Sequence, residues 1–259
     1  MRLDGAVALV TGASSGIGAA TAAALAAAGA SLLLTGRDET RLAEVAGRAG
    51  GTALGADLAA PGGAARLAER ALGTPLAAAR GGIDILVSNA GLGWAGPLGE
   101  IPAEKVTELA TVNLAAPIEL TRLLVPGMIE RGRGAVAFVS SIAGVTGVRG
   151  EAVYAATKAG LGGFAESLAY EVRGRGVAVS LIVPGVIDTP FFSRRGRPYG
   201  RARPAPLPAG RVAAAIVSAL EHGRPVVYVP GWLRFPAWLH GTAPGAFRVL
   251  AARFGDPGY

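Results

Sequence analysis

The sequence predicts an α/β fold: a doubly wound parallel sheet of about seven strands with helices on both faces. Short runs recur that are apolar nearly throughout, as in strands covered on both faces, and do not alternate with polar residues. The segments between them are long enough for right-handed helical crossovers. Neither an internal repeat nor a linker divides the 259 residues, so we expect one domain over 1–259.

The expected strands are AVALV at 6–10, SLLL at 31–34, ILV at 85–87, AVAFV at 135–139, VAVSLIV at 177–183 and VVYV at 226–229, with GTAL at 51–54 as a weaker candidate. Helices are expected over 16–29, 38–49, 62–80, 103–131, 151–174 and 209–222.

Two segments depart from this pattern. Residues 188–208 cluster Pro, Arg and Gly, which excludes a regular helix throughout, and a loop of this length in a compact domain is usually a lid or is disordered. Residues 231–259 carry aromatics and leucines, which favour a helical and partly apolar extension.

Composition excludes several kinds of chemistry. The chain has no Cys, so it can hold neither a disulfide nor a thiolate nucleophile nor a Cys-ligated metal centre. Its only histidines, His222 and His240, lie too far apart for the usual zinc pairing, so no metal site is expected. No segment is typical of a transmembrane helix or a secretion signal, which favours a soluble cytoplasmic protein.

The net charge of +7 is concentrated in the last quarter of the chain. Residues 1–193 carry a net charge of −1 and residues 194–259 carry +8. Five arginines fall within RRGRPYGRAR at 194–203. The loop could select an anionic substrate or an acyl carrier, and the alternative function is a cofactor-binding protein whose Arg-rich loop binds an acidic partner or nucleic acid. One basic loop without a basic face is more often simply solvated, so nucleic-acid binding is not expected.

A glycine-rich turn, TGASSGIG at 11–18, follows the first expected strand and opens a helix. Gly12 permits a tight turn, while Gly16 and Gly18 permit close approach of the backbone to a pyrophosphate and of the helix to the sheet. Gly12, Ser14 and Gly16 also match the G-x-S-x-G elbow of α/β-hydrolases. That alternative is disfavoured because only ten residues precede the turn and no oxyanion-hole segment is present.

The end of the second expected strand bears on the choice of cofactor. An NAD enzyme usually has an acidic residue there, whereas this chain reads LLLTGRD, with Gly36 followed by Arg37. A guanidinium suits the 2′-phosphate of NADP(H), and Gly36 removes a carboxylate that would repel it. The alternative is that Arg37 is an ordinary solvated residue and Asp38 binds the ribose.

YAATK at 154–158 places Tyr154 and Lys158 four residues apart, on one face of an expected helix. A free phenol, with a pKa of about 10, is a poor proton donor at neutral pH, and a nearby ammonium lowers that pKa. Lys158 is one of only two lysines in an arginine-rich chain. Alone, the pair is also compatible with an ordinary helix surface.

Together these motifs resemble the short-chain dehydrogenase/reductase family over nearly the whole chain. The resemblance rests on TGASSGIG at 11–18, SNAG at 88–91, Asn113, SSIAG at 140–144, YAATK at 154–158 and PGVIDT at 184–189, in the family's order and spacing. It implies a Rossmann-like fold and a catalytic tetrad of Asn113, Ser141, Tyr154 and Lys158. Ser140 neighbours the catalytic serine, but the spacing favours Ser141.

The resemblance also implies roles. Tyr154 would protonate a carbonyl oxygen or act as base in the reverse reaction, Ser141 would polarise the carbonyl, Lys158 would hold the nicotinamide ribose and lower the pKa of Tyr154, and Asn113 would anchor a water. The implied cofactor-binding residues are Gly12, Ser14, Ser15, Gly16, Ile17, Gly18, Arg37, Asp57, Leu58, Asn89, Ala90, Gly91, Tyr154, Lys158, Pro184, Gly185, Ile187 and Thr189. Purely structural roles remain open for several of them: Asn89 binding strand backbone, Asp57 capping a turn, and Pro184 with Gly185 ending a strand.

We therefore expect an NADP(H)-dependent enzyme that interconverts a carbonyl compound and an alcohol and forms a homodimer or homotetramer. An apolar wall is expected from Trp94, Val145, Val148, Phe191 and Phe192, which favours a hydrophobic substrate, although these aromatics could instead only pack the lid down. The segment WLRFPAWL at 232–239 could lie on a membrane surface, with Trp232, Leu233, Phe235, Trp238 and Leu239 among the headgroups, or cover an oligomer interface or the active-site mouth.

Overall fold

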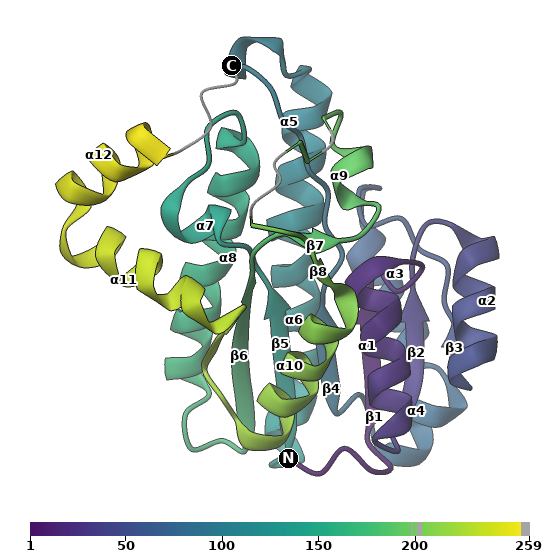
Figure 1. Ribbon diagram of the computed structural model, residues 1–259. Coiled ribbons are helices and arrows are strands. Elements are labelled where there is room, and N and C mark those ends of the chain that lie inside the picture. The colour runs from purple at the N-terminus through teal and green to yellow at the C-terminus, as the bar shows by residue number, and fades with distance from the viewer. Residues whose placement is uncertain (198, 201–203, 255–259) are drawn as a thin grey trace.

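The computed structural model describes residues 1–197, 199–200 and 204–254 (Figure 1). Seven parallel strands form one sheet in the order β3-β2-β1-β4-β5-β6-β9. Their bounds are Val7–Thr11 (β1), Ser31–Thr35 (β2), Thr52–Ala53 (β3), Ile85–Ser88 (β4), Gly134–Val139 (β5), Val177–Pro184 (β6) and Val226–Val229 (β9). The predicted fold class is confirmed, and the weak strand candidate at 51–54 is a two-residue edge strand.

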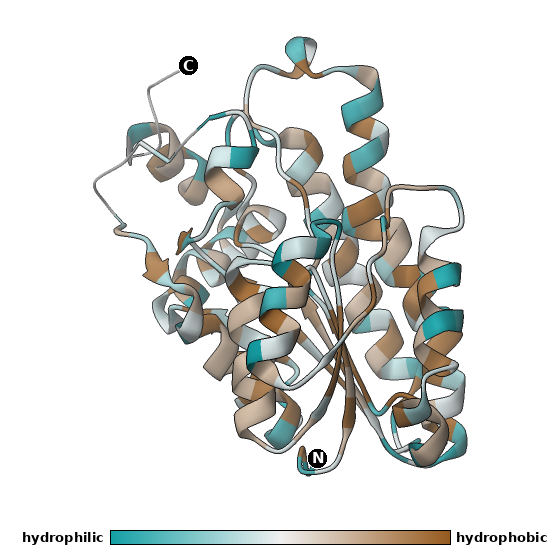
Figure 2. Cartoon of the chain, turned by 90° about the vertical axis from the view of Figure 1, so that its right-hand side faces the viewer, coloured by the Kyte–Doolittle hydropathy of each residue, from teal (hydrophilic) through white to brown (hydrophobic). Residues whose placement is uncertain are grey.

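Helices cover both faces of the sheet, which explains why its strands are apolar nearly throughout (Figure 2). On one face lie α1 (Gly16–Ala27), α2 (Glu39–Ala49) and α10 (Ala209–His222), whose Leu25, Leu42 and Ile216 pack with Val10 and other strand residues. On the other lie α3 (Gly63–Leu72), α4 (Pro75–Arg80), α6 (Ala116–Glu130) and α8 (Ala152–Glu171), packed around Phe138.

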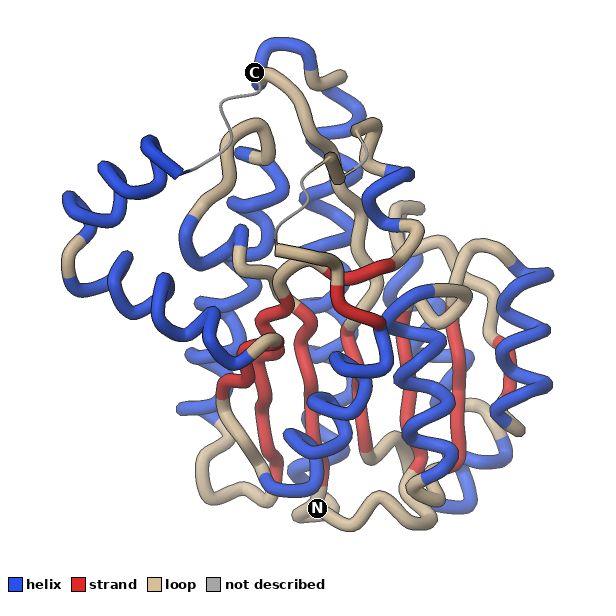
Figure 3. Tube along the Cα trace, in the orientation of Figure 1, coloured by secondary structure: helices blue, strands red, loops and turns tan. Residues whose placement is uncertain are grey.

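The strand order reverses between β1 and β4, so the loops after these two strands part at the carboxyl edge of the sheet. Above this edge lie α7 (Ala143–Thr146), α9 (Phe191–Arg194) and a small parallel pair, β7 (Ile187–Asp188) with β8 (Leu207–Pro208) (Figure 3). Ligands bind at such reversal points in open α/β sheets. The topology therefore predicts a site beneath α9 and the β7–β8 pair.

Two predicted helices differ from the observed ones. The segment 62–80 is not one helix: α3 ends at Leu72, and α4 begins anew at Pro75, with Thr74 as N-cap accepting a hydrogen bond from the backbone N–H of Ala77 at 3.3 Å. The segment 103–131 comprises α5 (Ala103–Ala110) and α6 joined by a π-helical turn over Thr111–Ala115, which contains Asn113. Such turns are frequent at functional sites.

The helical run Ala103–Glu130 is long and apolar enough to cross a membrane by length and composition alone. Half of its most apolar window is buried inside the fold, and Leu109, Leu120 and Leu124 belong to its buried residues. This packing is that of a core helix.

The extension after β9 contains a 3₁₀ turn (Gly231–Leu233), α11 (Arg234–Thr242) and α12 (Pro244–Phe254), which project from the body of the fold (Figure 1). Trp232, Phe235 and Trp238 are exposed, as a surface-binding segment requires. Leu233 is not: it is 5% exposed and packs beside Gly185. The expected apolar face is therefore narrower than the sequence suggested.

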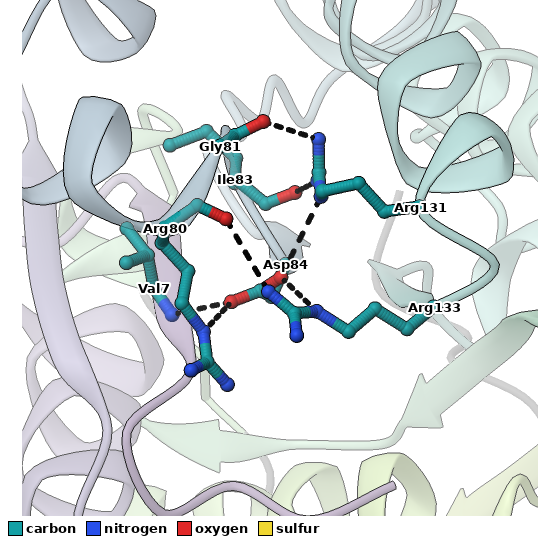
Figure 4. A network of polar contacts seen from close by, with 7 residues as sticks. All are labelled: Val7, Arg80, Gly81, Ile83, Asp84, Arg131 and Arg133. Atoms are coloured by element: carbon teal, nitrogen blue, oxygen red, sulfur yellow. Dashed lines mark hydrogen bonds and ion pairs between the residues drawn. The ribbon is translucent and has the colours of Figure 1, made fainter.

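At the opposite edge of the sheet, the carboxylate of Asp84 is buried directly before β4 (Figure 4). It accepts hydrogen bonds from the Val7 backbone N–H at 3.1 Å, Arg80 Nε at 3.1 Å and Arg133 Nε at 3.0 Å, and Arg131 Nε lies at 3.9 Å. This network joins α4, β1, β5 and the end of α6 and leaves the carboxyl edge free for ligands.

Candidate active site

A cavity of about 1300 Å³ opens at the carboxyl edge of the sheet. It is lined by the loops after β1 to β6, the start of α8, the segment around α9, and Ala251 and Ala252 of α12. This volume exceeds that of an ordinary small-molecule pocket and leaves room for a large cofactor beside a substrate. Ala251 and Ala252 of α12 therefore lie at the mouth of the site, whereas the segment 232–239, for which the sequence left a cover of the mouth open, contributes no lining residue.

The glycine-rich turn connects β1 to α1 by backbone that only glycine adopts easily. Gly12 and Gly16 have φ values of +66° and +56°, and a Cβ at Gly18 would lie 2.2 Å from the carbonyl oxygen of Gly12. Gly12, Ser14, Ser15, Gly16 and Ile17 line the cavity, whereas Gly18 lies behind them and packs α1 against the turn.

Thr11 and Asn89 tie the ends of β1 and β4 together below this turn. The Thr11 hydroxyl accepts hydrogen bonds from the backbone N–H groups of Asn89 and Ala90, both at 2.9 Å. The Asn89 amide donates to the Thr11 carbonyl at 2.9 Å and to the Gly12 carbonyl at 3.3 Å. Asn89 therefore has the structural role that the sequence left open, and it also lines the cavity with Ala90 and Gly91. The sequence did not predict a role for Thr11, because the hydrogen-bond partners of its hydroxyl lie in and after β4, about 76 residues away along the chain.

Three cationic side chains lie at the end of β2. Arg37 Nη1 lies 3.3 Å from Glu108 Oε1, and Lys105 Nζ lies 2.7 Å from Glu108 Oε2. Asp38 is the N-cap of α2, accepting from the Arg41 backbone N–H at 3.0 Å, with its other oxygen 3.3 Å from Arg41 Nε. Arg37, Arg41 and Lys105 all line the cavity; the last two were not predicted because they come from separate helices.

The remaining predicted cofactor residues are distributed around the same cavity. Asp57 and Leu58 follow β3, and the Asp57 side chain also accepts from the Ala59 backbone N–H at 3.0 Å, as a turn-capping residue does. Pro184, Gly185, Ile187 and Thr189 line the cavity from β6 and β7.

Tyr154 and Lys158 project from one face of α8, and Ser141 follows β5. All three line the cavity and are nearly buried. Lys158 Nζ donates to the Val139 carbonyl at 2.9 Å and lies 6.0 Å from the centre of the Tyr154 ring. Ser140 lines the cavity as well, but its hydroxyl donates to the Lys158 carbonyl at 3.0 Å, whereas the Ser141 hydroxyl is hydrogen-bonded with Tyr154.

Burial dominates the titration of both residues on α8. It raises the pKa of Tyr154 well above its usual value, although a hydrogen bond with Ser141 and the charge of Arg195 oppose the shift and the charge of Glu151 adds to it. Burial lowers the pKa of Lys158 to about 8, so its ammonium persists at neutral pH. The net shift of the Tyr154 pKa is thus opposite to the lowering expected from Lys158, because removal of the phenol from water outweighs its neighbours.

Asn113 is fully buried in the π-helical turn and does not line the cavity. Its side-chain carbonyl accepts from the Leu92 backbone N–H at 2.8 Å, while its amide donates to the Leu92 carbonyl at 2.9 Å and to Thr157 Oγ1 at 3.1 Å. Asn113 therefore fastens the loop after β4 to α8, directly behind Lys158.

The segment around α9 closes over the tyrosine. The Phe191 ring lies 5.4 Å from that of Tyr154, and Phe192 lies 5.4 Å from Tyr199. Phe191, Phe192 and Val148 line the cavity as expected, whereas Trp94 and Val145 are not among its lining residues. Trp94 folds back beside Gly96, a position that a sequence pattern cannot reveal.

The arginines expected to attract an acidic partner are partly engaged within the fold. Arg194 Nη1 donates to Ser15 Oγ at 3.3 Å, and Arg195 forms a nearly buried ion pair with Glu151. Arg201 and Arg203 lie outside the described residues. This arrangement does not favour the nucleic-acid alternative.

Residues 6–199 match the family model described as short chain dehydrogenase. The chain belongs to the short-chain dehydrogenase family. The 3-oxoacyl-[acyl-carrier-protein] reductase of Escherichia coli is 34% identical over 217 residues, covering 83% of this chain and 87% of that protein. The solved short-chain dehydrogenase of Sphingobium yanoikuyae, in complex with NADPH, aligns with a TM-score of 0.81 at 29% identity over 94% of this chain and 95% of that one.

The solved relatives hold nicotinamide cofactors of different kinds. A short-chain dehydrogenase/reductase of Burkholderia phymatum, solved with NAD, aligns with a TM-score of 0.83 at 25% identity over 93% of this chain and 94% of that one. This short-chain dehydrogenase is thus an oxidoreductase that uses a nicotinamide cofactor.

The residues present fit such a cofactor. The glycine-rich turn offers close backbone approach for a pyrophosphate, and cations stand at the end of β2. Thr35 Oγ1, which is buried beside the cavity, finds no hydrogen-bond partner within the described residues and can serve a ligand hydroxyl.

Proposed function

We propose that this short-chain dehydrogenase interconverts a ketone or aldehyde and the corresponding alcohol, with NADP(H) as cofactor and a hydrophobic substrate. The observation that carries the proposal is the convergence of Ser141, Tyr154 and Lys158 in one cavity, from the end of β5 and one face of α8. The catalytic assignment predicted from the motif spacing is the one this geometry supports.

The bound nicotinamide supplies a hydride to the carbonyl carbon in reduction and receives one in oxidation. In reduction the Tyr154 hydroxyl gives its proton to the carbonyl oxygen, and in oxidation its phenolate takes the proton of the alcohol. Ser141, which is hydrogen-bonded with Tyr154, donates to the same substrate oxygen and orients it. The raised pKa of Tyr154 keeps its proton available at neutral pH, which supports reduction.

Lys158 and Asn113 support the reaction at Tyr154 without contacting the substrate oxygen. The Lys158 ammonium holds ribose hydroxyls and counteracts part of the burial cost of the phenolate that forms on Tyr154. Asn113 keeps α8 and the loop after β4 in register and anchors a water of the proton relay. The first of these roles for Asn113 rests on its bonds to Leu92 and Thr157, while the second is an inference from family resemblance.

We assign the rest of the cofactor to the predicted cavity residues. Gly12, Ser14, Ser15, Gly16 and Ile17 hold the pyrophosphate, with Gly18 packing α1 against this turn, and Asp57 and Leu58 meet the adenine. Asn89 to Gly91 line the adenosine ribose, and Ile187 and Thr189, which follow Pro184 and Gly185, hold the carboxamide.

The preference for NADP(H) rests on the end of β2. Arg37 and Lys105 share Glu108, and both can turn to a phosphate, which offers more acceptor oxygens than one carboxylate. Asp38 is occupied as the N-cap of α2, which reduces its capacity to take the ribose hydroxyls of NAD(H).

The test of this preference is a fluorescence titration with NADPH and NADH. Arg37→Ala should weaken NADPH binding about tenfold, the low end for a charge-assisted hydrogen bond because Arg37 is half exposed, and leave NADH binding unchanged. Arg48→Ala, an exposed arginine on α2 outside the cavity lining, is the matched control. Equal affinity of the native protein for both cofactors would refute the preference.

The test of the chemistry is Tyr154→Phe. This variant removes one oxygen and should abolish reduction while NADPH still binds, since the ring and its contact with Phe191 are retained. Turnover at the native rate would overturn the assignment of Tyr154.

The hydrophobic substrate is supported by Phe191 and Phe192 at the cavity. A panel of ketones of increasing apolar size, assayed with NADPH, should show KM falling as the apolar area of the substrate grows.

We expect a homodimer or homotetramer, and sedimentation equilibrium measures the oligomeric state. Contact of 232–239 with a membrane is testable by vesicle co-sedimentation.

A further inference from the structure

A buried ion pair links the lid to the catalytic helix. Arg195, directly after α9, donates through Nη1 to Glu151 Oε1, and the two side chains are only 10% and 12% exposed. Glu151 is the residue that opens α8, three positions before Tyr154. Removing two charged groups from water costs free energy, and their mutual attraction offsets this cost only when further contacts fix the geometry of the pair.

Further contacts hold the arginine in place. Its Nε donates to the Arg197 carbonyl at 3.0 Å, and its guanidinium lies 4.6 Å from the centre of the Phe192 ring. Its backbone carbonyl accepts from the Ala95 N–H at 3.2 Å, in the loop after β4. Arg195 therefore ties three segments of the cavity wall together.

The position of the neighbouring aromatic ring depends on this arrangement. Phe191 stacks obliquely on Tyr154, and a Cβ at Gly93 would meet Phe191 Cζ at 2.6 Å and Arg195 Cβ at 3.0 Å. Only a glycine at position 93 leaves room for the lid to lie this close to the loop after β4.

We propose that Glu151 and Arg195 form a clasp that closes the lid over Tyr154, and that Arg195 is a positioning residue for the reaction. The clasp presses Phe191 against the catalytic phenol and defines the apolar wall that the substrate meets. The proposal rests on the proposed function for its kinetic consequences, but the clasp itself can be tested without turnover.

The pair also balances charge beside the phenol. Within the described part of the chain, the charged groups beside Tyr154 are Glu151, the N-cap of α8, Lys158 of α8, and Arg195 of the lid. Ser141 and the loop residues 91–95 are uncharged. Glu151 raises the pKa of Tyr154 and Arg195 lowers it, so removal of either partner alone unbalances the site.

The first arm of the test measures hydrogen exchange of the lid amides in the protein alone. Arg195→Met and Glu151→Gln should each increase exchange over 188–197 at least about tenfold, because either change breaks the clasp. Arg211→Met, an exposed arginine on α10, is the matched control and should leave this exchange unchanged. Native-like exchange in both clasp variants would overturn the proposal, whether or not any turnover is found.

The second arm compares the alkaline limb of alcohol oxidation, where activity rises as Tyr154 loses its proton, between the native protein and the variants. The rising limb should move to higher pH by about half a unit or more in Arg195→Met and to lower pH in Glu151→Gln. The double variant should return towards the native limb, because both charges are gone, while its KM stays raised because the clasp is absent. A general structural defect would not be reversed by the second substitution.

A further variant separates closure from charge. Gly93→Ala crowds Phe191 and the Cβ of Arg195 but keeps both charges, so KM should rise while the pH limb moves less than in Arg195→Met. A limb that does not move in Arg195→Met, or that moves equally in Gly93→Ala, would refute the electrostatic role of Arg195.

Discussion

Replacement of Asp84 by alanine should cost about 3 kcal/mol of unfolding free energy. The Asp84 side chain is 1% exposed, so removing it deprives the Val7 N–H of its acceptor and leaves three arginines without their shared carboxylate. Loss of one partner of a buried ion pair costs about 3–5 kcal/mol. The lower value applies here, because Arg80 and Arg133 are 39% and 43% exposed and can regain water.

Urea unfolding followed by far-ultraviolet circular dichroism measures this loss, at one protein concentration for every variant. A loss of 3 kcal/mol shifts the unfolding equilibrium about a hundredfold. Asp84→Asn keeps an acceptor for Val7 and should lose less than the alanine variant. Glu119→Ala, which breaks the exposed pair between Glu119 and Arg122 at 2.7 Å, is the control and should cause no measurable change. A loss below about 1 kcal/mol in Asp84→Ala would refute the reasoning.

Three further predictions concern the core, the glycine-rich turn and Lys158. Phe138→Ala should lose about 3–5 kcal/mol in the same unfolding assay, because the ring is fully buried against Phe164; a loss under about 2 kcal/mol would mean that the site collapses easily. Gly18→Ala should weaken NADPH binding by about tenfold or more, since its Cβ would lie 2.2 Å from the Gly12 carbonyl oxygen, whereas Gly47→Ala, with open space around it, should bind as the native protein does. Because burial lowers the pKa of Lys158 to about 8 from 10.5, the unfolded chain holds more protons than the folded one between these values, and the unfolding free energy should rise with pH over that window. This increase of the unfolding free energy with pH should be absent in Lys158→Met. If the increase persists in that variant, it arises from another titratable group.

Much of the fold could be predicted because its elements are local patterns. The apolar pattern of a strand that is covered on both faces does not depend on which strand it pairs with. All six main strands were therefore predicted to within a residue or two of their observed bounds. The errors have local causes as well: Thr74 and Pro75 restart a helix within 62–80, and a π-helical turn interrupts 103–131.

The site shows the same division. Ser141, Tyr154 and Lys158 could be named from spacing, because a helix of fixed pitch and a strand end of fixed direction place them without reference to distant segments. Lys105 and Thr11 could not. Lys105 reaches the cavity because α5 lies beside the end of β2, where Arg37 shares Glu108 with it, and Thr11 bonds to Asn89 and Ala90 of a distant segment.

For this short-chain dehydrogenase, local sequence patterns were sufficient for the strands, the glycine-rich turn, and the places of Ser141, Tyr154 and Lys158 at the cavity. Tertiary packing decided the rest: the burial that raises the pKa of Tyr154, the pairing of Glu151 with Arg195, and the inward turn of arginines that looked like free charge. The reason is physical. Dihedral preferences and side-chain periodicity act over a few residues, whereas burial and ion pairing depend on which distant segments the fold brings together.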